Sequence, residues 1–203
     1  MKEKDMKNIP DSYSPSVVEV EKYIDRWNHL ENYVNQERAL DKLFLKRFPT
    51  NIELEDILIK CSTLNDFYST NIFDVHSVAK HIWMIENKDK RLLNGDITLV
   101  DEIAHVKVGL ENKPRLFYSF ATKYCSHHQP YKYAIYDNYV EKVLMFFKRR
   151  DGFSEFTLRE LKDYATYMRV IHDFMRYYRL EQYNLKQIDQ YLWQVGKEHY
   201  SKF

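Results

Sequence analysis

The sequence predicts an all-α protein. Only 4 glycines and 5 prolines interrupt its 203 residues, and apolar residues recur at spacings of three and four instead of alternating. With 44% hydrophobic residues, the chain is long enough to bury one core or two small helical lobes that share a groove. Pro10 and Pro15 lie among polar residues, so residues 1–16 are expected to form a flexible tail before one helical domain over residues 17–203.

Helical periodicity continues through the first half of the chain, with stop and start signals between the segments. Pro49 ends the first pattern, and Asp74 is a suitable N-cap for a later helix. Residues 87–95 are charged and are expected to form a connector. The helical segments predicted here are residues 17–48 (one long helix or two joined ones), a stretch that begins at Asn51, a short segment over 64–71, and residues 75–85.

The middle of the chain is expected to contain a helical hairpin. Asp96 can cap a helix over residues 97–108, and Gly109 lies where a C-cap glycine is expected. The Gly/Pro connector over residues 109–114 leads to a second helix that starts near Arg115. Two helices joined by such a tight turn form a helical hairpin.

The chain after Pro130 is expected to be extended until Asp137, which can cap the next helix, ending near residue 149. Asp151 and Gly152 then break the pattern. The last predicted helices cover residues 157–179 and 185–195.

Composition narrows the possible functions. Two cysteines exclude a disulfide framework and a four-cysteine iron–sulfur or zinc site within one chain, and they favour a reducing cytoplasm. No segment approaches about 18 uncharged apolar residues, so neither secretion nor membrane spanning is expected.

Charge is unevenly distributed, although the net charge is only +1. Residues 113–150 contain eight basic residues and only two acidic ones, Asp137 and Glu141. Such a run is commonly an ordinary solvated helix face, and it also suits phosphate binding. The basic residues are Lys113, Arg115, Lys123, Lys132, Lys142, Lys148, Arg149 and Arg150.

Two short motifs carry a resemblance to a known family. The first runs Ser119-Phe120-Ala121-Thr122-Lys123-Tyr124-Cys125, and the second runs Ala134-Ile135-Tyr136-Asp137-Asn138-Tyr139-Val140. They resemble the lysine-bearing second helix and the aspartate-ended apolar run of the helix-hairpin-helix DNA glycosylases, most nearly the 8-oxoguanine glycosylase-like branch. In that resemblance, Ser119 and Ala121 occupy two positions that are glycine in the family.

The resemblance implies a fold of two helical lobes with a groove between them, with the catalytic hairpin region over about residues 97–150. It implies a DNA glycosylase with associated AP lyase activity on duplex DNA with an oxidised purine such as 8-oxoguanine, without a metal or organic cofactor. Lys123 is then the Schiff-base nucleophile, and Asp137 is its carboxylate partner. A free lysine, with a pKa near about 10.4, needs partial desolvation or a base before it can attack.

Further residues are expected to bind DNA. The resemblance suggests that the segment ending in Asn71 offers an amide to the gap left by a flipped base. His127 could contact phosphate or base, whereas an adjacent histidine pair is a poor metal site because helix neighbours face different ways. The predicted DNA-binding residues are Tyr68, Asn71, Lys113, Arg115, Ser119, Ala121 and His127.

Two other functions fit the same sequence. One is a non-catalytic nucleic-acid-binding or base-sensing module on the same fold, for which the resemblance suggests a role in bacterial anti-phage defence. The near-neutral net charge favours this module over the enzyme. The other is a protein-interaction scaffold. Asp137 alone is also a good N-cap, and a lone lysine and aspartate at this spacing are commonly structural. The lesion, the choice between DNA, RNA and nucleotide, and the oligomeric state stay open.

Overall fold

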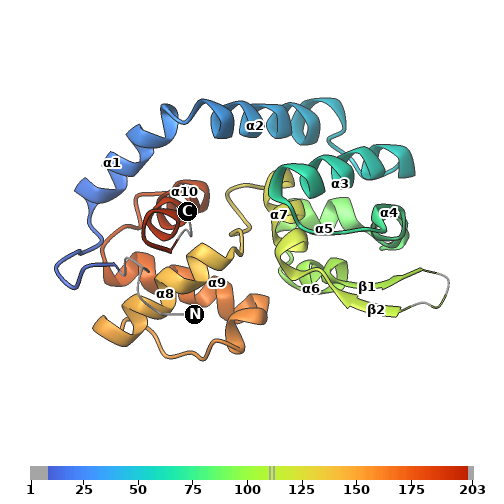
Figure 1. Ribbon diagram of the computed structural model, residues 1–203. Coiled ribbons are helices and arrows are strands. Elements are labelled where there is room, and N and C mark those ends of the chain that lie inside the picture. Colours follow the sequence, from blue (N-terminus) through green and yellow to red (C-terminus); the bar gives the residue numbers. More distant parts are fainter. Residues whose placement is uncertain (1–8, 110, 112, 201–203) are drawn as a thin grey trace, which may run out of the picture. The chain divides into compact units, whose positions relative to one another are not determined.

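Figure 1 shows the computed structural model, which describes residues 9–109, 111 and 113–200. The described chain is mostly helical, as predicted, with one small two-stranded sheet. It divides into two compact units, with boundaries after Leu30 and after Ile135. The first unit combines residues up to 30 with residues from 136 onward, and the second unit is the segment between them.

The first unit contains α1 (Val17–Asn28), α8 (Asn138–Asp151), the 3₁₀ turn η2 (Glu160–Lys162), α9 (Tyr164–Tyr177) and α10 (Leu185–Tyr200). Side-chain caps fix where its helices begin: Ser16 accepts a hydrogen bond from the Glu19 N–H, and Asp163 accepts one from the Thr166 N–H. Its core is strongly aromatic, with the ring of Phe147 packed against those of Phe174 and Tyr178.

The second unit contains α2 (Glu31–Asp41), the π-helical segment η1 (Lys42–Arg47), α3 (Leu54–Tyr68), α4 (Val75–Met84), α5 (Lys88–Asn94), α6 (Thr98–Ala104), β1 (His105–Val108), β2 (Lys113–Leu116) and α7 (Tyr118–His128). The predicted Asp74 cap is confirmed, because its carboxylate accepts a hydrogen bond from the Ser77 N–H at 3.1 Å. The region over residues 17–48 forms two helices followed by η1, the second of the two predicted alternatives.

The prediction that a tight turn joins two helices here is wrong. A β-hairpin separates α6 from α7, with His105 paired to Leu116 and Val108 paired to Lys113. Alternating side chains explain the strand, since Val106 is buried while its neighbours are exposed or half-buried. Gly109 has a φ of +70° and begins the strand turn instead of capping a helix, so α7 starts at Tyr118 and not near Arg115.

Four smaller expectations also fail. Helix α3 extends through most of the short segment expected over residues 64–71, and α5 occupies the expected connector. The helix expected over residues 157–179 is divided at Asp163, whose side chain caps α9. The tail is not free from residue 9 onward, because Ile9 is buried and the hydroxyl groups of Tyr13 and Tyr191 are hydrogen bonded at 3.0 Å. Residues 1–8 of that expected tail lie outside the described residues.

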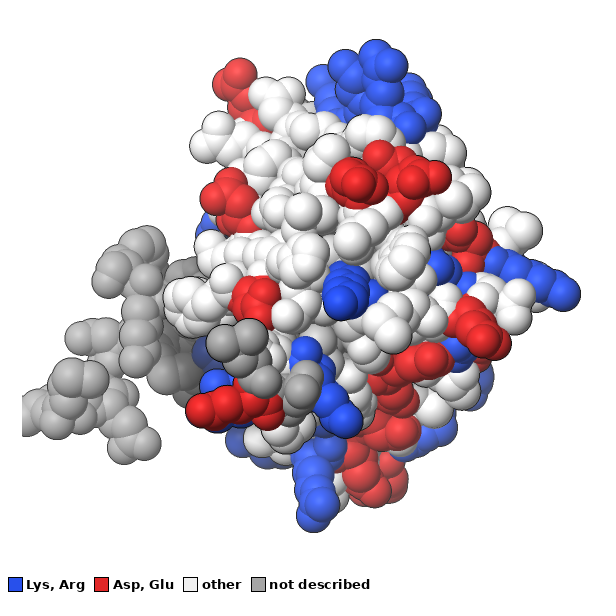
Figure 2. All heavy atoms as spheres, turned by 90° about the vertical axis from the view of Figure 1, so that its right-hand side faces the viewer, with Lys and Arg blue, Asp and Glu red and all other residues white. Residues whose placement is uncertain are grey.

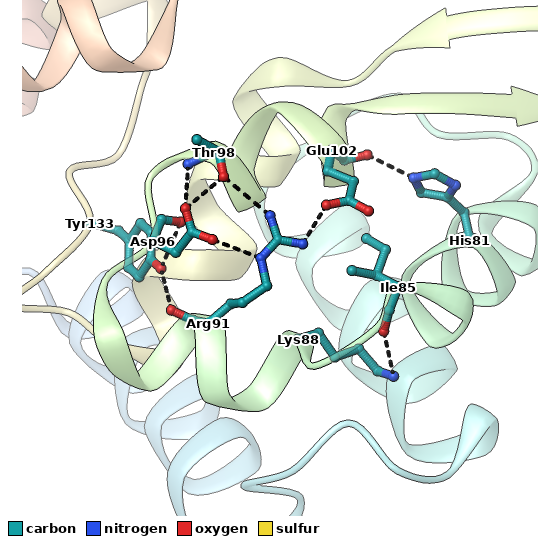
Figure 3. A network of polar contacts seen from close by, with 8 residues as sticks. All are labelled: His81, Ile85, Lys88, Arg91, Asp96, Thr98, Glu102 and Tyr133. Atoms are coloured by element: carbon teal, nitrogen blue, oxygen red, sulfur yellow. Dashed lines mark hydrogen bonds and ion pairs between the residues drawn. The ribbon is translucent and has the colours of Figure 1, made fainter.

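A polar network fixes the chain on both sides of α7 (Figure 3). The Arg91 guanidinium binds the carboxylates of Asp96, at 2.7 Å, and Glu102. It also donates a hydrogen bond to the Thr98 hydroxyl at 3.2 Å, which joins α5 to α6. The Tyr133 hydroxyl donates to the carbonyl oxygens of Arg91 and Asp96 at 3.3 and 3.2 Å. The segment that leaves α7 is therefore anchored to α5 and to the turn before α6.

In the first unit, α8 and α10 approach closely at Gly196. A Cβ atom added there would lie 2.6 Å from the Tyr139 Cβ and 2.7 Å from the Tyr139 carbonyl oxygen. Helix backbones can approach this closely only where a side chain is missing. Gly196 is therefore a packing requirement of the first unit.

We expect Gly196→Ala to lower the free energy of unfolding by about 1 to 3 kcal/mol, because the new methyl group forces the two helices apart. Denaturant unfolding followed by circular dichroism measures the change. Asn138→Ala is the matched control, since Asn138 is exposed at the start of α8. Equal stability of the two variants would show that the helix contact yields without cost.

Candidate functional site

Helix α7 is buried although much of it is polar. Every residue from Phe120 to His128 is buried, and Ser119 is half-buried. Buried polar groups need hydrogen-bond partners, so the neighbours of α7 must supply them. They do so on two faces of the helix, one directed toward Tyr68 and the other toward Lys60.

The first face carries what we term the Lys123 cluster: Ser119, Lys123 and His127 of α7 with Tyr68 of α3. The three α7 residues are spaced by four and therefore share one side of the helix. The Lys123 Nζ donates a hydrogen bond to the Ser119 Oγ at 2.6 Å and lies 5.1 Å from the centre of the Tyr68 ring. A hydrogen bond of 2.9 Å joins the Tyr68 hydroxyl to His127 Nε2.

This geometry places four of the predicted site residues together, from two helices of one unit. The Lys123 side chain is 2% exposed, whereas Tyr68, which covers its amine, is 38% exposed. An amine held against an aromatic ring is partly desolvated and is stabilised as a cation by the ring. A surface-exposed tyrosine therefore contacts this buried amine.

The second face carries the Lys60 network, which was not predicted from the sequence. The Lys60 Nζ donates hydrogen bonds to the carbonyl oxygens of Phe48 and Thr50, at 3.1 and 2.8 Å, and to the Asn51 Oδ1 at 2.6 Å. Burial lowers the pKa of Lys60 to about 8, and the Asp89 carboxylate partly opposes that shift. The available signal was a lysine within the apolar stripe of α3, beside Ile57.

Residues of α7 complete this network. The Tyr124 hydroxyl donates to the same Asn51 oxygen, and His128 Nε2 lies 3.4 Å from the Lys60 Nζ. Burial, followed by the nearby Lys60 charge, holds the pKa of His128 well below its usual range. The backbone N–H of Asn51 and its side-chain amide in turn donate to the Asp89 carboxylate. The network thus connects α7 to the start of α3 and to α5.

The predicted Asn71 lies on a pinned loop at the end of α3. The Asn65 side chain accepts a hydrogen bond from the Ile72 N–H at 2.9 Å and donates one to the Ile72 carbonyl oxygen at 3.0 Å. Asn71 is exposed with a φ of +58°, and the next exposed side chain, Phe73, is 99% exposed. Few phenylalanines are so completely exposed to water.

Other predicted residues are placed apart from the Lys123 cluster. Lys113 and Arg115 are exposed on β2. Ala121 is fully buried, and its N–H donates to the Phe117 carbonyl oxygen at 2.9 Å. The expected contact between Ala121 and DNA therefore has no exposed atom through which it could form.

Asp137 belongs to the first unit, where it is the N-cap of α8 and accepts a hydrogen bond from the Tyr139 N–H at 2.8 Å. That placement confirms the predicted helix start. The carboxylate is half-buried and lies at the positive end of the α8 dipole. The predicted pairing of Asp137 with Lys123 stays a prediction.

The residues of the basic run are divided between the two units. Lys113, Arg115 and Lys132 belong to the second unit, and the remaining exposed or half-buried basic residues of the run lie on α8 of the first. Figure 2 shows one face of the molecule, on which acidic and basic side chains intermingle with uncharged surface.

Among the described residues, no group of three histidine, cysteine or carboxylate side chains could hold a metal ion. Within the same residues, no helix is both long and apolar enough to cross a membrane.

Residues 19–132 match the model of the HI_0787_N family, which is described as an N-terminal domain. The chain belongs to this family. An uncharacterized protein of Haemophilus influenzae is 46% identical over 173 residues, which cover 85% of this chain and 78% of that protein. No solved structure matches the chain. The family match includes Lys123 and the whole Lys123 cluster, and it ends before Asp137.

We expect Lys60→Met to destabilise the second unit by about 2 kcal/mol or more. The change removes the charged donor of three hydrogen bonds, including the one to the buried Asn51 Oδ1, and a hydrogen bond from a charged donor contributes about 1.5 to 3 kcal/mol. Denaturant unfolding tests this, with Lys80→Met, an exposed lysine of α4, as control. If both variants match the parent protein, the network contributes nothing to stability.

His128 should make the protein sensitive to acid. Its folded pKa is depressed, so its contribution to stability is fully present above pH 6.5 and is lost as the pH falls below that value. Uptake of one proton on unfolding lowers the free energy of unfolding by about 1.4 kcal/mol per pH unit. Between pH 7.5 and 5, the free energy of unfolding should therefore depend less on pH in His128→Gln than in His76→Gln. His76 is the control because it is exposed on α4. Parallel curves would contradict this assignment.

Proposed function

We propose that the protein is a DNA glycosylase with associated AP lyase activity, in which Lys123 is the nucleophile. The observation that carries the proposal is the position of the Lys123 amine, 2.6 Å from a serine hydroxyl and against the ring of Tyr68. The resemblance of the Lys123 and Asp137 motifs supports the same reading. An oxidised purine such as 8-oxoguanine in duplex DNA is the proposed substrate, and the buried, unpaired Cys61 and Cys125 suit a cytoplasmic setting.

In this proposal, Ser119 and Tyr68 prepare the amine. Lysine attacks only as the neutral amine, so Lys123 must lose a proton before it attacks. The amine nitrogen then forms a bond to the sugar C1′ while the glycosidic bond breaks, and the departing base takes up a proton from the nitrogen. The bond between C1′ and the ring oxygen next opens, and that oxygen takes up the second amine proton, which gives the imine. Loss of a C2′ proton from the imine then expels the 3′ phosphate and cleaves the strand. Ser119 directs the amine, and Tyr68 excludes water from it.

Asp137 is the proposed carboxylate partner. Positive charge develops at C1′ as the base departs, and a carboxylate nearby stabilises it. Its hydrogen bond to the Tyr139 N–H holds the Asp137 side chain in one orientation. Because a carboxylate held in one orientation moves little during the reaction, less free energy is needed to reorganise the site in the transition state.

The loop that carries Asn71 supports a role in opening the duplex. A target base must leave the stack before an amine can reach C1′. The Asn65 hydrogen bonds hold the loop rigid, and it presents an amide at Asn71 and a fully exposed ring at Phe73. We propose that Asn71 fills the space of the extruded base while Phe73 contacts the neighbouring bases.

A non-catalytic nucleic-acid-binding or base-sensing module in bacterial anti-phage defence is the second candidate. The 2% exposure of Lys123 favours it, because a nucleophile must reach its substrate, and so does the net charge of +1. The same groups would then bind an extruded base without chemistry.

Borohydride trapping separates the two candidates. With duplex DNA containing 8-oxoguanine, borohydride should reduce the imine and leave the protein covalently linked to the DNA. Lys123→Ala should abolish this adduct because it removes the only amine in the Lys123 cluster. Lys107→Ala, an exposed lysine of β1, is the control and should still be trapped.

Denaturing gels quantify the adduct, and an electrophoretic mobility shift measures binding in parallel. A shifted complex without any adduct would support the binding module and reject the lyase. An adduct that survives Lys123→Ala would assign the nucleophile to another residue.

A further inference from the structure

A groove of about 900 Å³ in the first unit takes no part in the chemistry proposed above. The N-terminal segment at Ile9, one side of α8, Leu158 and the end of α10 at Tyr200 surround it. All of these residues belong to the first unit, whereas the Lys123 cluster lies in the second. The groove is therefore a feature of one unit.

Three cations of α8 line the groove; Arg150 is one, and the other two are Lys142 and Arg149. Arg150 is held by its own partners, so the cations of interest for anion binding are Lys142 and Arg149. They lie seven residues apart, which is two helical turns, so they share one side of α8 at a spacing of about 10 Å along its axis. Both side chains are exposed, and neither forms a hydrogen bond or ion pair with any residue the structure describes. The Lys142 amine lies over the rings of Tyr139 and Tyr200.

Lys142 and Arg149 differ from the neighbouring cations of α8, which form hydrogen bonds or ion pairs with other residues. The Arg150 guanidinium binds the Asp151 carboxylate at 2.6 Å and the Asp11 carbonyl oxygen at 2.9 Å. The Lys148 amine donates to the carbonyl oxygen of Phe156. Lys142 and Arg149 remain available for an anion from outside.

Two carboxylates, those of Glu141 and Asp11, also line the groove, and they differ in their contacts with other side chains. Glu141 is 3.2 Å from the Lys162 amine and accepts a hydrogen bond from the Tyr136 hydroxyl. The exposed Asp11 carboxylate repels an anionic ligand, so removal of its negative charge should strengthen the binding of an anion.

The remaining lining is apolar. Met145 and Phe146 are half-buried on α8, and Leu158 is 49% exposed opposite them. Phosphate-binding cations interleaved with apolar and aromatic surface are typical of grooves that bind single-stranded nucleic acid, in which bases stack between the backbone contacts. An acidic peptide would use the two cations but would leave the aromatic and apolar lining unmatched.

We propose that this groove binds nucleotide units of single-stranded DNA, with phosphates on Lys142 and Arg149 and a base against Phe146. The site extends the proposed DNA function to a strand displaced or frayed beside the lesion, and it rests on that function only in its choice of DNA as the polymer. A free nucleotide carries the same phosphate and base chemistry.

Fluorescence anisotropy of the full-length chain with a fluorescein-labelled oligodeoxythymidine tests the proposal. Arg149→Gln and Lys142→Gln should each weaken binding and lower the slope of log K against log salt by about 0.7. Phe146→Leu should weaken binding by roughly five-fold or more, and Asp11→Asn should strengthen it. Arg159→Gln, an exposed cation outside the groove, is the matched control. Thermal melts establish that each variant is folded.

Competition identifies the source of the ligand. Displacement of the oligonucleotide by thymidine monophosphate at equal nucleotide concentration would assign the groove to free nucleotides, and displacement only by unlabelled strand would assign it to DNA. Unchanged affinity and salt slope in the Lys142 and Arg149 variants, or equal displacement by polyglutamate, would overturn the proposal. Trapping is measured on Lys123→Ala and strand binding on the Lys142 and Arg149 variants, so the two losses report on separate proposals.

Discussion

The second unit depends on satisfying the polar side chains of a buried helix. Helix α7 contains serine, threonine, lysine and two histidines, yet its neighbours cover nearly all of it. Burial of such groups without partners would cost several kcal/mol each. The fold meets this requirement by aiming Tyr68 at one face of α7 and the Lys60 network at the other. The positions of α3 and of the loop before it are therefore tied to the polar residues of α7.

That requirement also explains which parts of the site the sequence could reveal. Spacing by four is enough to place Ser119, Lys123 and His127 on one side of a helix, and the residues around Asp137 are enough to predict an N-cap. The Lys60 network could not be assembled in the same way, because its members come from four separate segments of the chain. Only the lysine in an apolar stripe marked it.

The turn before α7 shows a different limit. Gly109 and Pro114 correctly mark a reversal of the chain, but the same residues end helices and strands alike. The choice was made by the short alternation around Val106 and by its burial, which depends on the packing of β1 against α4. The Phe117 N–H, which donates to the Ala104 carbonyl oxygen, closes the hairpin and fixes where α7 begins. The local pattern at this turn therefore marked the chain reversal but did not decide between helix and strand.

Lys60 and Lys123 show how two buried lysines of one unit can suit different tasks. Three oxygen acceptors surround the Lys60 amine, and it could attack a substrate only after losing all three hydrogen bonds. The Lys123 amine instead donates to a side-chain hydroxyl and lies against a ring that is 38% exposed. Contact with a surface residue, and not burial itself, is what distinguishes Lys123 from Lys60.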